Sequence, residues 1–311
     1  MTLEYSHKID IIKAEAQRLG FDACGIVSAA EVADKEFFKS WLENGSAKDI
    51  SYMGNHFEKR MDPRLLVENA KSIIVVALNY FPAKFIPSAN PLFSYYAYGK
   101  DYHEVLKDKL RELYCFIDRE ICNISGRIFV DSAPVLERYW AVRAGIGFVG
   151  KNTQLIIPNK GSYFFIGEII SDLNIESFPN IIVNKCGSCT NCIEACPANA
   201  LEKPCFLNAE KCLSYQTIEN KGDLSPQTKE NIGNRVYGCD VCQMVCPHNR
   251  FAKPNQTPEF YPSEEFLSLD LAKLKSLTEE DFKRIFKNSP VKRAGYKGLK
   301  RNIDDINMSH N

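Results

Sequence analysis

The sequence lacks any long hydrophobic run. No stretch approaches the roughly 20 apolar residues that a membrane-spanning helix needs. Residues 1–20 also lack the apolar run of a signal peptide, because charged residues interrupt them and their apolar side chains are spaced like one face of a helix. We therefore expect a soluble cytoplasmic protein with no part in the membrane.

The chain also lacks net charge, since 39 Lys plus Arg balance 39 Asp plus Glu in 311 residues. The whole molecule thus has no net field to attract nucleic acid, and any such affinity needs a local patch. One candidate lies at 283–301, where eight Lys or Arg occur without Asp or Glu, together with Phe286 and Tyr296. This composition is compatible with a solvated helix face or with contact to structured RNA.

Cysteine, by contrast, is abundant. The chain has 12, and nine of them lie between residues 186 and 246. In a protein without an export signal such clustered thiols bind metal or do redox chemistry rather than form disulfides. Four cysteines stand apart from the repeated spacings, and we expect them to be ordinary core or loop thiols: Cys24, Cys115, Cys122 and Cys205.

The clustered cysteines form one complete and one partial ferredoxin motif. Residues 186–197 have the spacing C-x2-C-x2-C-x3-C-P, and residues 239–247 have C-x2-C-x3-C-P, for which Cys212 is the best candidate for the missing first cysteine. In bacterial ferredoxins the fourth cysteine of each run ligates the other cluster. Structural zinc is the alternative, but zinc sites require neither the third close cysteine nor the prolines. The predicted ligands are Cys186, Cys189, Cys192 and Cys246 for cluster one, and Cys212, Cys239, Cys242 and Cys196 for cluster two.

The pattern along the chain predicts an α+β or α/β protein in three parts. Residues 1–175 alternate helical and strand patterns, with strands at 72–78 and 127–130 and a hairpin that joins 153–157 to 163–170. Residues 176–261 form a ferredoxin-like module with two 4Fe-4S clusters, and residues 262–311 form a short helical tail that packs on the core and is a candidate contact for structured RNA. Additional folded sequence before the clusters favours an enzyme over a simple electron carrier.

Three features near the middle of the chain allow more than one interpretation. Residues 145–150 match the dinucleotide-binding fingerprint GxGxxG, but they follow a helix and precede a strand, the reverse of the required order. Asp131 follows a predicted strand, where it either faces an active site or caps a helix that starts near Ser132 and Pro134. His103 has the same two interpretations.

Several segments together resemble the epoxyqueuosine reductase family, and they extend over most of the chain. They are MDPR (61–64), DYH (101–103), VDSAPVLER (130–138), GFVGKN (147–152), CLSYQTIE (212–219), GCDVCQMVCP (238–247) and RAGY (293–296). The resemblance implies a cobalamin-dependent enzyme that reduces epoxyqueuosine to queuosine at the wobble position of tRNA. It implies cobalamin in an N-terminal catalytic domain, although the DxHxxG signature of many cobalamin proteins is absent.

The resemblance also implies roles for individual residues. Asp131 matches the proton-donating aspartate of the family, a role for which we expect partial burial to raise its pKa towards neutrality. The implied cofactor contacts are Arg60, Tyr98, Asp131, Lys151, Asn152, Ser162, Ser214 and Asp240. The implied partners are the tRNA anticodon stem-loop and an electron donor such as ferredoxin or flavodoxin, and the enzyme is expected to be a monomer. The alternatives are a dehalogenase-like corrinoid reductase of a small molecule and a two-cluster electron-transfer protein.

Overall fold

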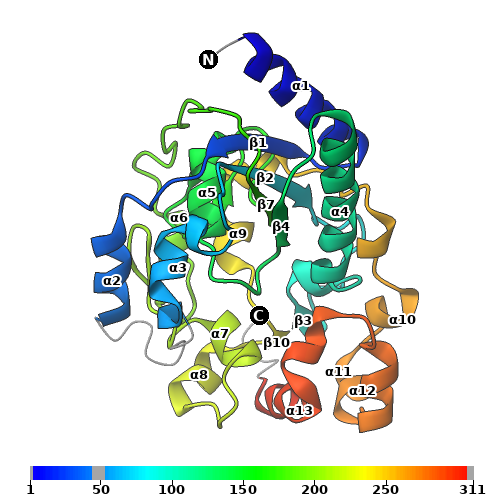
Figure 1. Cartoon of the computed structure of the whole chain (residues 1–311). Helices are drawn as coiled ribbons and strands as arrows, with labels where there is room; N and C mark the ends of the chain where they lie inside the picture. Colours follow the sequence, from blue (N-terminus) through cyan, green and yellow to red (C-terminus); the bar gives the residue numbers. More distant parts are fainter. Residues whose placement is uncertain (1–2, 44–52, 307–311) are drawn as a thin grey trace.

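A four-stranded antiparallel sheet forms the centre of the molecule (Figure 1). The computed structural model describes residues 3–43 and 53–306. The strand order is β1 (Ala23–Ser28), β2 (Ser72–Asn79), β7 (Phe164–Ser171) and β4 (Gly126–Phe129), and every pairing is antiparallel. β2 is a run of apolar residues rather than an alternating pattern because both faces of the sheet are covered. Of the two predicted classes, the structure is therefore α+β.

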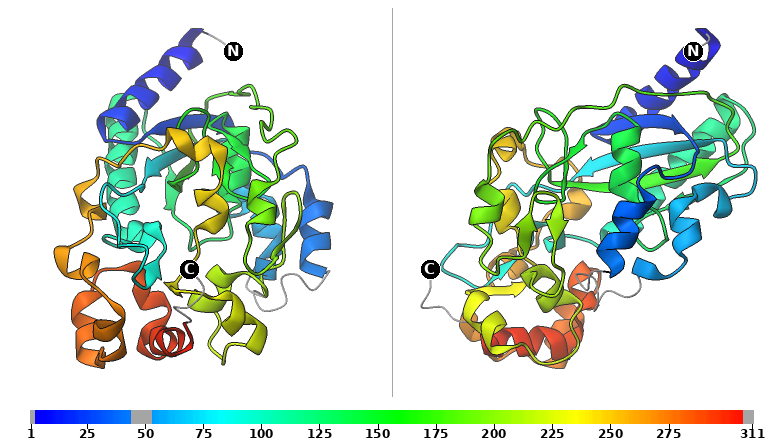
Figure 2. Two further views of the ribbon diagram at one scale, coloured as in Figure 1. Left: turned by 180° about the vertical axis from the view of Figure 1, so that it is seen from behind. Right: turned by 90° about the vertical axis from the view of Figure 1, so that its left-hand side faces the viewer.

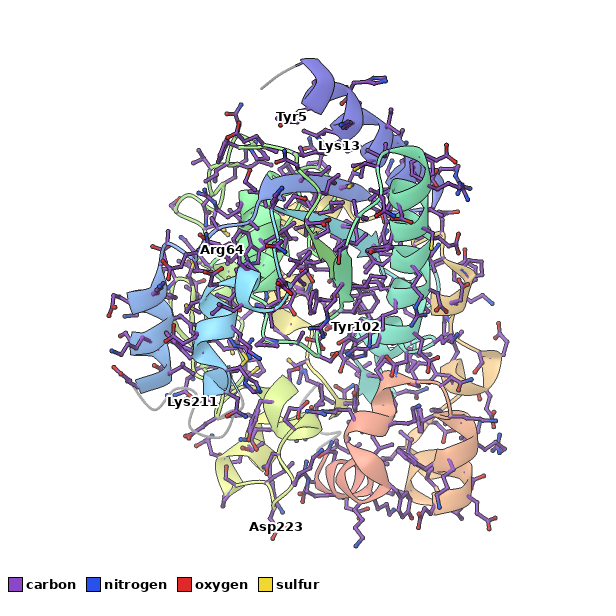
Figure 3. The ribbon with its side chains drawn as sticks, in the orientation of Figure 1. Tyr5, Lys13, Arg64, Tyr102, Lys211 and Asp223 are labelled. Carbon is purple, nitrogen blue, oxygen red and sulfur yellow. The ribbon has the colours of Figure 1, made fainter. Side chains whose placement is uncertain are left out.

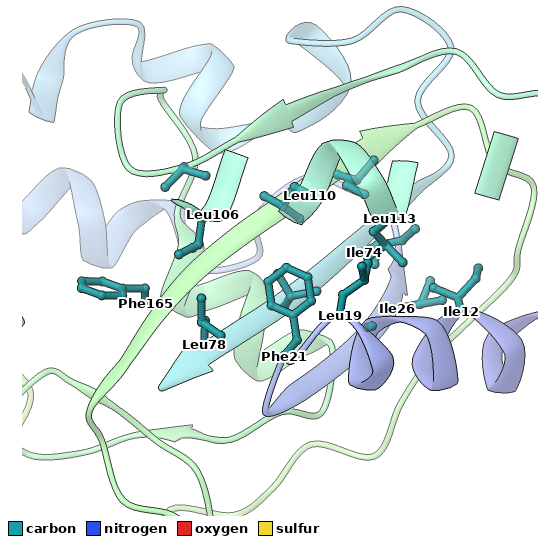
Figure 4. Close-up of a cluster of buried hydrophobic side chains, with 14 of the residues drawn as sticks. Ile12, Leu19, Phe21, Ile26, Ile74, Leu78, Leu106, Leu110, Leu113 and Phe165 are labelled. Carbon is teal, nitrogen blue, oxygen red and sulfur yellow. The ribbon is translucent and has the colours of Figure 1, made fainter. Parts of the chain in front are cut away.

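Helices cover the two faces of this sheet. α1 (Leu3–Arg18) and α4 (Tyr102–Glu120) pack on one face, where Ile12, Leu106 and Leu110 meet the strands (Figure 4). α5 (Glu137–Arg143) packs on the other, with α2 (Lys35–Glu43) and α3 (Phe57–Met61) at its margin. β1 approaches the end of α5 so closely that a Cβ at Gly25 would lie 2.2 Å from the carbonyl oxygen of Ala144. Only glycine fits at this contact.

Two local predictions were wrong. The helix expected near Ser132 begins at Glu137, because Asp131 adopts a left-handed backbone with φ 54° and the chain continues without helix to Leu136. The expected hairpin is also absent: β6 (Leu155–Ile156) pairs with β5 (Phe148–Val149), whereas β7 pairs with β2 and β4. A single bridge between Ile157 and Gly161 closes the intervening turn. Burial of β7 in the main sheet outweighed the local turn signal.

The cysteine-rich segment consists of short elements. They are α6 (Asn191–Glu194), β8 (Leu201–Lys203), β9 (Phe206–Leu207), α7 (Leu213–Ile218), α8 (Pro226–Asn231), β10 (Arg235–Tyr237) and α9 (Val241–Met244). β10 pairs in parallel with β3 (Leu92–Phe93), so a strand from the N-terminal part completes this region. Short 3-10 helices join the larger elements, among them Pro63–Leu65, Tyr95–Ala97, Pro247–Phe251, Pro258–Phe260 and Pro290–Arg293.

The tail contains α10 (Glu264–Leu267), α11 (Leu271–Lys275), α12 (Glu279–Ile285) and α13 (Gly295–Asp305), which lie below the sheet beside α7 and α8 (Figures 1 and 2). Its apolar side chains form a third core around Tyr237 and Phe93. Asn302 of α13 is fully buried and donates to the carbonyl oxygens of Thr217 and Val236, each at 2.8 Å. The tail thus supports the segment that carries the second set of cysteines. The three-part division with boundaries at 175 and 261 stays a prediction.

No helix in the described residues is long and apolar enough to cross a membrane.

Candidate active site

The structure distributes the eight motif cysteines over two neighbouring cavities. One cavity, of about 380 Å³, is lined by Cys196, Cys212, Cys239 and Cys242. The other, of about 230 Å³, is lined by Cys186, Cys189, Cys192 and Cys246. These are the two sets that the ferredoxin crossover rule predicts. We call the larger space cavity one and the smaller space cavity two. Cavity one is lined by the predicted ligands of cluster two, and cavity two by those of cluster one.

Short helices and one glycine place these thiols. α6 carries Cys192 and α9 carries Cys242, and the two helices pack against each other. Before Cys239, Gly238 has φ +74°, and a Cβ there would lie 2.2 Å from the Ser94 hydroxyl oxygen. Its backbone N–H donates to the Thr217 hydroxyl at 2.8 Å. The loop can therefore approach β3 only with glycine at this position.

The four thiols of each set are spread around the wall of a cavity and do not converge on a single point. In residues 3–43 and 53–306 no three His, Cys, Asp or Glu side chains converge to hold a single metal ion. A 4Fe-4S cluster takes one thiolate on each iron, so its four ligands are spread around it. The remaining cysteine of the segment, Cys205, lines neither cavity, and its Sγ lies 3.5 Å from the carbonyl oxygen of Gly150.

Cavity one also receives polar side chains from several elements. Of the cofactor contacts implied by the resemblance, five line it: Asp131, Asn152, Ser162, Ser214 and Asp240. Asn152 donates to the carbonyl oxygen of Cys242 at 3.1 Å, and Asp240 accepts from the backbone N–H of Tyr95 at 2.7 Å. Burial raises the pKa of Asp240 to about 6. Asn152 and Asp240 are therefore held in place by hydrogen bonds within the protein.

Three of the implied contacts lie elsewhere. The Lys151 ammonium lines cavity two and donates to the carbonyl oxygens of Gly187 and Cys189 at 2.7 and 2.8 Å. Arg60 is buried in α3 and Tyr98 in the third core, and neither lines cavity one or cavity two. The assignment of these three as cofactor contacts stays a prediction.

Asp131 projects into cavity one and belongs to a hydrogen-bonded group at the start of α4. The Tyr102 hydroxyl donates to its carboxylate, and Figure 3 shows Tyr102 near the middle of the molecule. His103 Nε2 lies 3.4 Å from the same oxygen, and His103 Nδ1 lies 2.8 Å from an oxygen of Asp101. Asp131 caps no helix, because α5 begins six residues later. The imidazole is held between two carboxylates.

This arrangement reverses the expected titration of Asp131. Desolvation raises its pKa, but the hydrogen bonds from His103 and Tyr102 together outweigh that effect, and the pKa is lower than usual. The expectation of a pKa near neutrality was therefore wrong. Asp101 and then Asp131 raise the pKa of His103 to about 9. At neutral pH the proton of this pair resides on the imidazole.

Sequence reasoning missed two further carboxyl groups. Glu137, the first residue of α5, also lines cavity one, and burial and the charge of Asp131 raise its pKa to about 8. Glu168 lies in the middle of β7, is fully buried, and neither carboxylate oxygen has a hydrogen-bond partner. A lone acid within the apolar run 164–171 was the signal that could have identified Glu168.

The basic stretch at 283–301 is partly neutralised by acids from neighbouring elements. Arg293 binds Glu219 with two parallel contacts, Nε–Oε1 at 2.9 Å and Nη2–Oε2 at 2.8 Å. Lys283, Arg284 and Lys300 form ion pairs with nearby acids, and Arg301 donates to backbone carbonyl oxygens. Contact of this stretch with tRNA stays a prediction.

Comparisons with known proteins agree with one another. The family model described as "Epoxyqueuosine reductase QueG, DUF1730" matches residues 60–132, and that of the "4Fe-4S double cluster binding domain" matches residues 185–249. The chain is 46% identical to the epoxyqueuosine reductase of Cellulophaga algicola, over 95% of this chain and 96% of the relative. It is 47% identical to that of Leadbetterella byssophila, over 94% and 96%.

Solved structures give the same result. A crystal structure of a selenomethionine-labelled epoxyqueuosine reductase matches with a TM-score of 0.88 and 33% identity, over 97% of this chain and 81% of the other. A second, solved with a tRNA-Tyr epoxyqueuosine-modified stem loop, matches with a TM-score of 0.87 at the same identity and coverage.

Proposed function

This chain belongs to the epoxyqueuosine reductase family, and we propose that it reduces epoxyqueuosine to queuosine at the wobble position of tRNA. The similarity to relatives of that name along most of the chain supports this activity. One observation of the structure carries it: a single cavity is lined both by the four thiols of one cluster and by the acid Asp131. An electron source and a proton source therefore face the same space.

Two 4Fe-4S clusters and cobalamin are the cofactors, and the residues present fit them. The thiols form two sets of four, and hydrogen-bonding side chains line the rest of cavity one. When bound, these cofactors supply the two electrons that the reduction consumes. Asn152, Ser162, Ser214 and Asp240 are the side chains that we assign to the corrin.

The protein's own contribution is proton transfer. We assign to Asp131 the transfer of a proton to the departing epoxide oxygen, because it lines the cavity and its side chain is 61% exposed there. His103 holds that proton at neutral pH and passes it through Asp131, while Asp101 orients the imidazole.

Mass spectrometry of tRNA nucleosides tests the activity. Cells without this gene and without another such reductase should accumulate epoxyqueuosine, and rescue with the gene in the presence of cobalamin should restore queuosine. Unchanged queuosine levels in the deletion strain would exclude the reaction. Rescue with Asp131→Asn, which keeps the size of the side chain, should fail although the purified variant still binds cobalamin.

The same proposal includes the surroundings of the enzyme. The substrate is the anticodon stem-loop, the protein acts as a cytoplasmic monomer, and a small redox protein such as ferredoxin or flavodoxin supplies the electrons. Cavity two is the expected entry point for those electrons, because it holds the cluster set away from Asp131. Reduction of the clusters by a purified donor, followed by their visible absorption, tests this step. Family membership disfavours the dehalogenase-like and carrier alternatives.

A further inference from the structure

The proposed reaction needs more protons than Asp131 can hold. Removal of an epoxide oxygen as water leaves an alkene and consumes two electrons and two protons. Asp131 carries one proton at most, and its low pKa means that it receives this proton from His103. A second proton must reach the oxygen while the cavity is filled by substrate and cofactor. A group in the cavity wall that is protonated at neutral pH meets this need.

Glu137 occupies the right place for such a group. It begins α5, which packs over β2 and β7, and it lines cavity one together with Asp131. Its charged neighbours come from three directions: Asp131 precedes it, Arg138 follows it, and Arg60 approaches from α3. The two arginines favour the ionised carboxylate, but burial and the charge of Asp131 outweigh them, so Glu137 carries a proton at neutral pH.

Glu168 lies beneath Glu137 in the sheet. Its register partners are Val75 on β2 and Phe129 on β4, and both belong to the core on the face that α5 covers. It is completely buried, and neither of its oxygens has a hydrogen-bond partner. An ionised carboxylate in such surroundings would be strongly destabilising, so this group is a neutral acid. The charges of Glu137 and Asp131 act on it in the same direction.

We propose that Glu137 donates the second proton of the reduction to the departing oxygen. In the first transfer Asp131 gives its proton as one carbon–oxygen bond of the epoxide breaks, which leaves a hydroxyl group on the neighbouring carbon. In the second, Glu137 gives its proton to this hydroxyl group as the other carbon–oxygen bond breaks, and the oxygen leaves as water; the cofactors supply the two electrons. The carboxylate of Glu137 then regains a proton from solvent, whereas Glu168, which does not line the cavity, stays neutral throughout. This inference rests on the proposed function.

Infrared spectroscopy of the purified holoprotein tests the protonation without any turnover. Protonated carboxyl groups absorb apart from carboxylates, so the wild type should show two such bands at pH 7, of which one disappears as the pH passes about 8. Glu137→Gln should remove the band that titrates, and Glu168→Gln the band that persists. Glu112→Gln, on the exposed face of α4, is the matched control and should leave both.

Single turnover of an epoxyqueuosine stem-loop tests the role. Glu137→Gln should lower the rate at least tenfold without a change in KM, and Glu137→Asp should restore part of it. Glu168→Gln should leave the rate near that of the wild type, because this second neutral acid does not line the cavity. Wild-type rates in Glu137→Gln, or the absence of both bands at pH 7, would overturn the proposal. Both bands present in a protein that leaves epoxyqueuosine unchanged would instead refute the proposed function.

Discussion

His103 offers the sharpest test of how this site handles its first proton. The side chain is held between Asp101 and Asp131, which raise its pKa from 6.5 to about 9. The wild-type rate should therefore fall as the pH rises through about 9 because this proton is lost, above the separate fall near pH 8 that the donor role proposed for Glu137 requires. His103→Gln keeps a hydrogen-bond donor but cannot carry the proton.

The expected size of the effect is worked from the same contacts. General acid catalysis contributes roughly 10²–10⁴-fold to rates, and Asp131 alone retains part of it, so His103→Gln should lose on the order of 10²-fold at pH 7.5. Without His103 the largest of the effects that lower the pKa of Asp131 is gone, so this pKa should be higher in the variant than in the wild type. The variant should therefore lose activity at a lower pH than the wild type does.

Stability should change in parallel. A histidine whose pKa is raised by folding stabilises the protein below its unfolded pKa, here 6.5, and this contribution is lost as the pH rises through about 9. The difference in pKa corresponds to about 3 kcal/mol, which solvent screening of a side chain that is 32% exposed reduces to about 1–2 kcal/mol. Thermal unfolding at pH 6 and pH 10 measures it.

The assays need one control and have a clear negative result. His7→Gln removes an exposed histidine from α1, away from the site, and should match the wild type in both rate and stability. If His103→Gln shows the wild-type pH profile, or destabilises the protein equally at pH 6 and pH 10, His103 does not hold the proton. The reasoning from its two carboxylate neighbours would then be wrong.

Three other changes test the supports of the site. Asn302→Ala leaves two buried carbonyl oxygens without a donor, so it should cost about 2–4 kcal/mol and lower the content of cluster two, as measured by thermal unfolding and iron analysis. Cys212→Ser should reduce the iron content from about eight to about four atoms per chain, whereas Cys205→Ser should keep about eight; equal losses would contradict the ligand assignment. Gly25→Val should prevent soluble expression because its side chain would overlap the backbone of Ala144, and normal yield would show that α5 can shift.

Local spacing predicted which thiols lie together. Four thiolates in a C-x2-C-x2-C-x3-C-P run have few other uses, and the crossover rule places Cys196 and Cys246 in opposite sets, as they are in the two cavities. The long apolar run of β2 and the amphipathic pattern of α4 were equally direct, because burial on one or both faces sets their periodicity. Family resemblance added the substrate and cobalamin, which no spacing could provide.

The remaining features depended on contacts between distant segments. The partner of β7 is decided by the core of the main sheet, so the turn at 158–161 predicted the wrong hairpin. The charged residues of 283–301 are all basic in the sequence. In the folded chain Glu219, which is distant in sequence, lies beside Arg293 and offsets part of this positive charge.

The acid site shows the same difference between what the local sequence determines and what the tertiary structure determines. The sequence by itself determined the cluster chemistry and identified Asp131 as an acid candidate, because those signals are local. Only the tertiary structure decided where the protons reside, since a pKa depends on burial and on neighbours such as His103 from α4. It also placed Glu137 in the cavity, at a position that the sequence showed only as an ordinary acid, and it buried Glu168 on the face of the sheet that α5 covers.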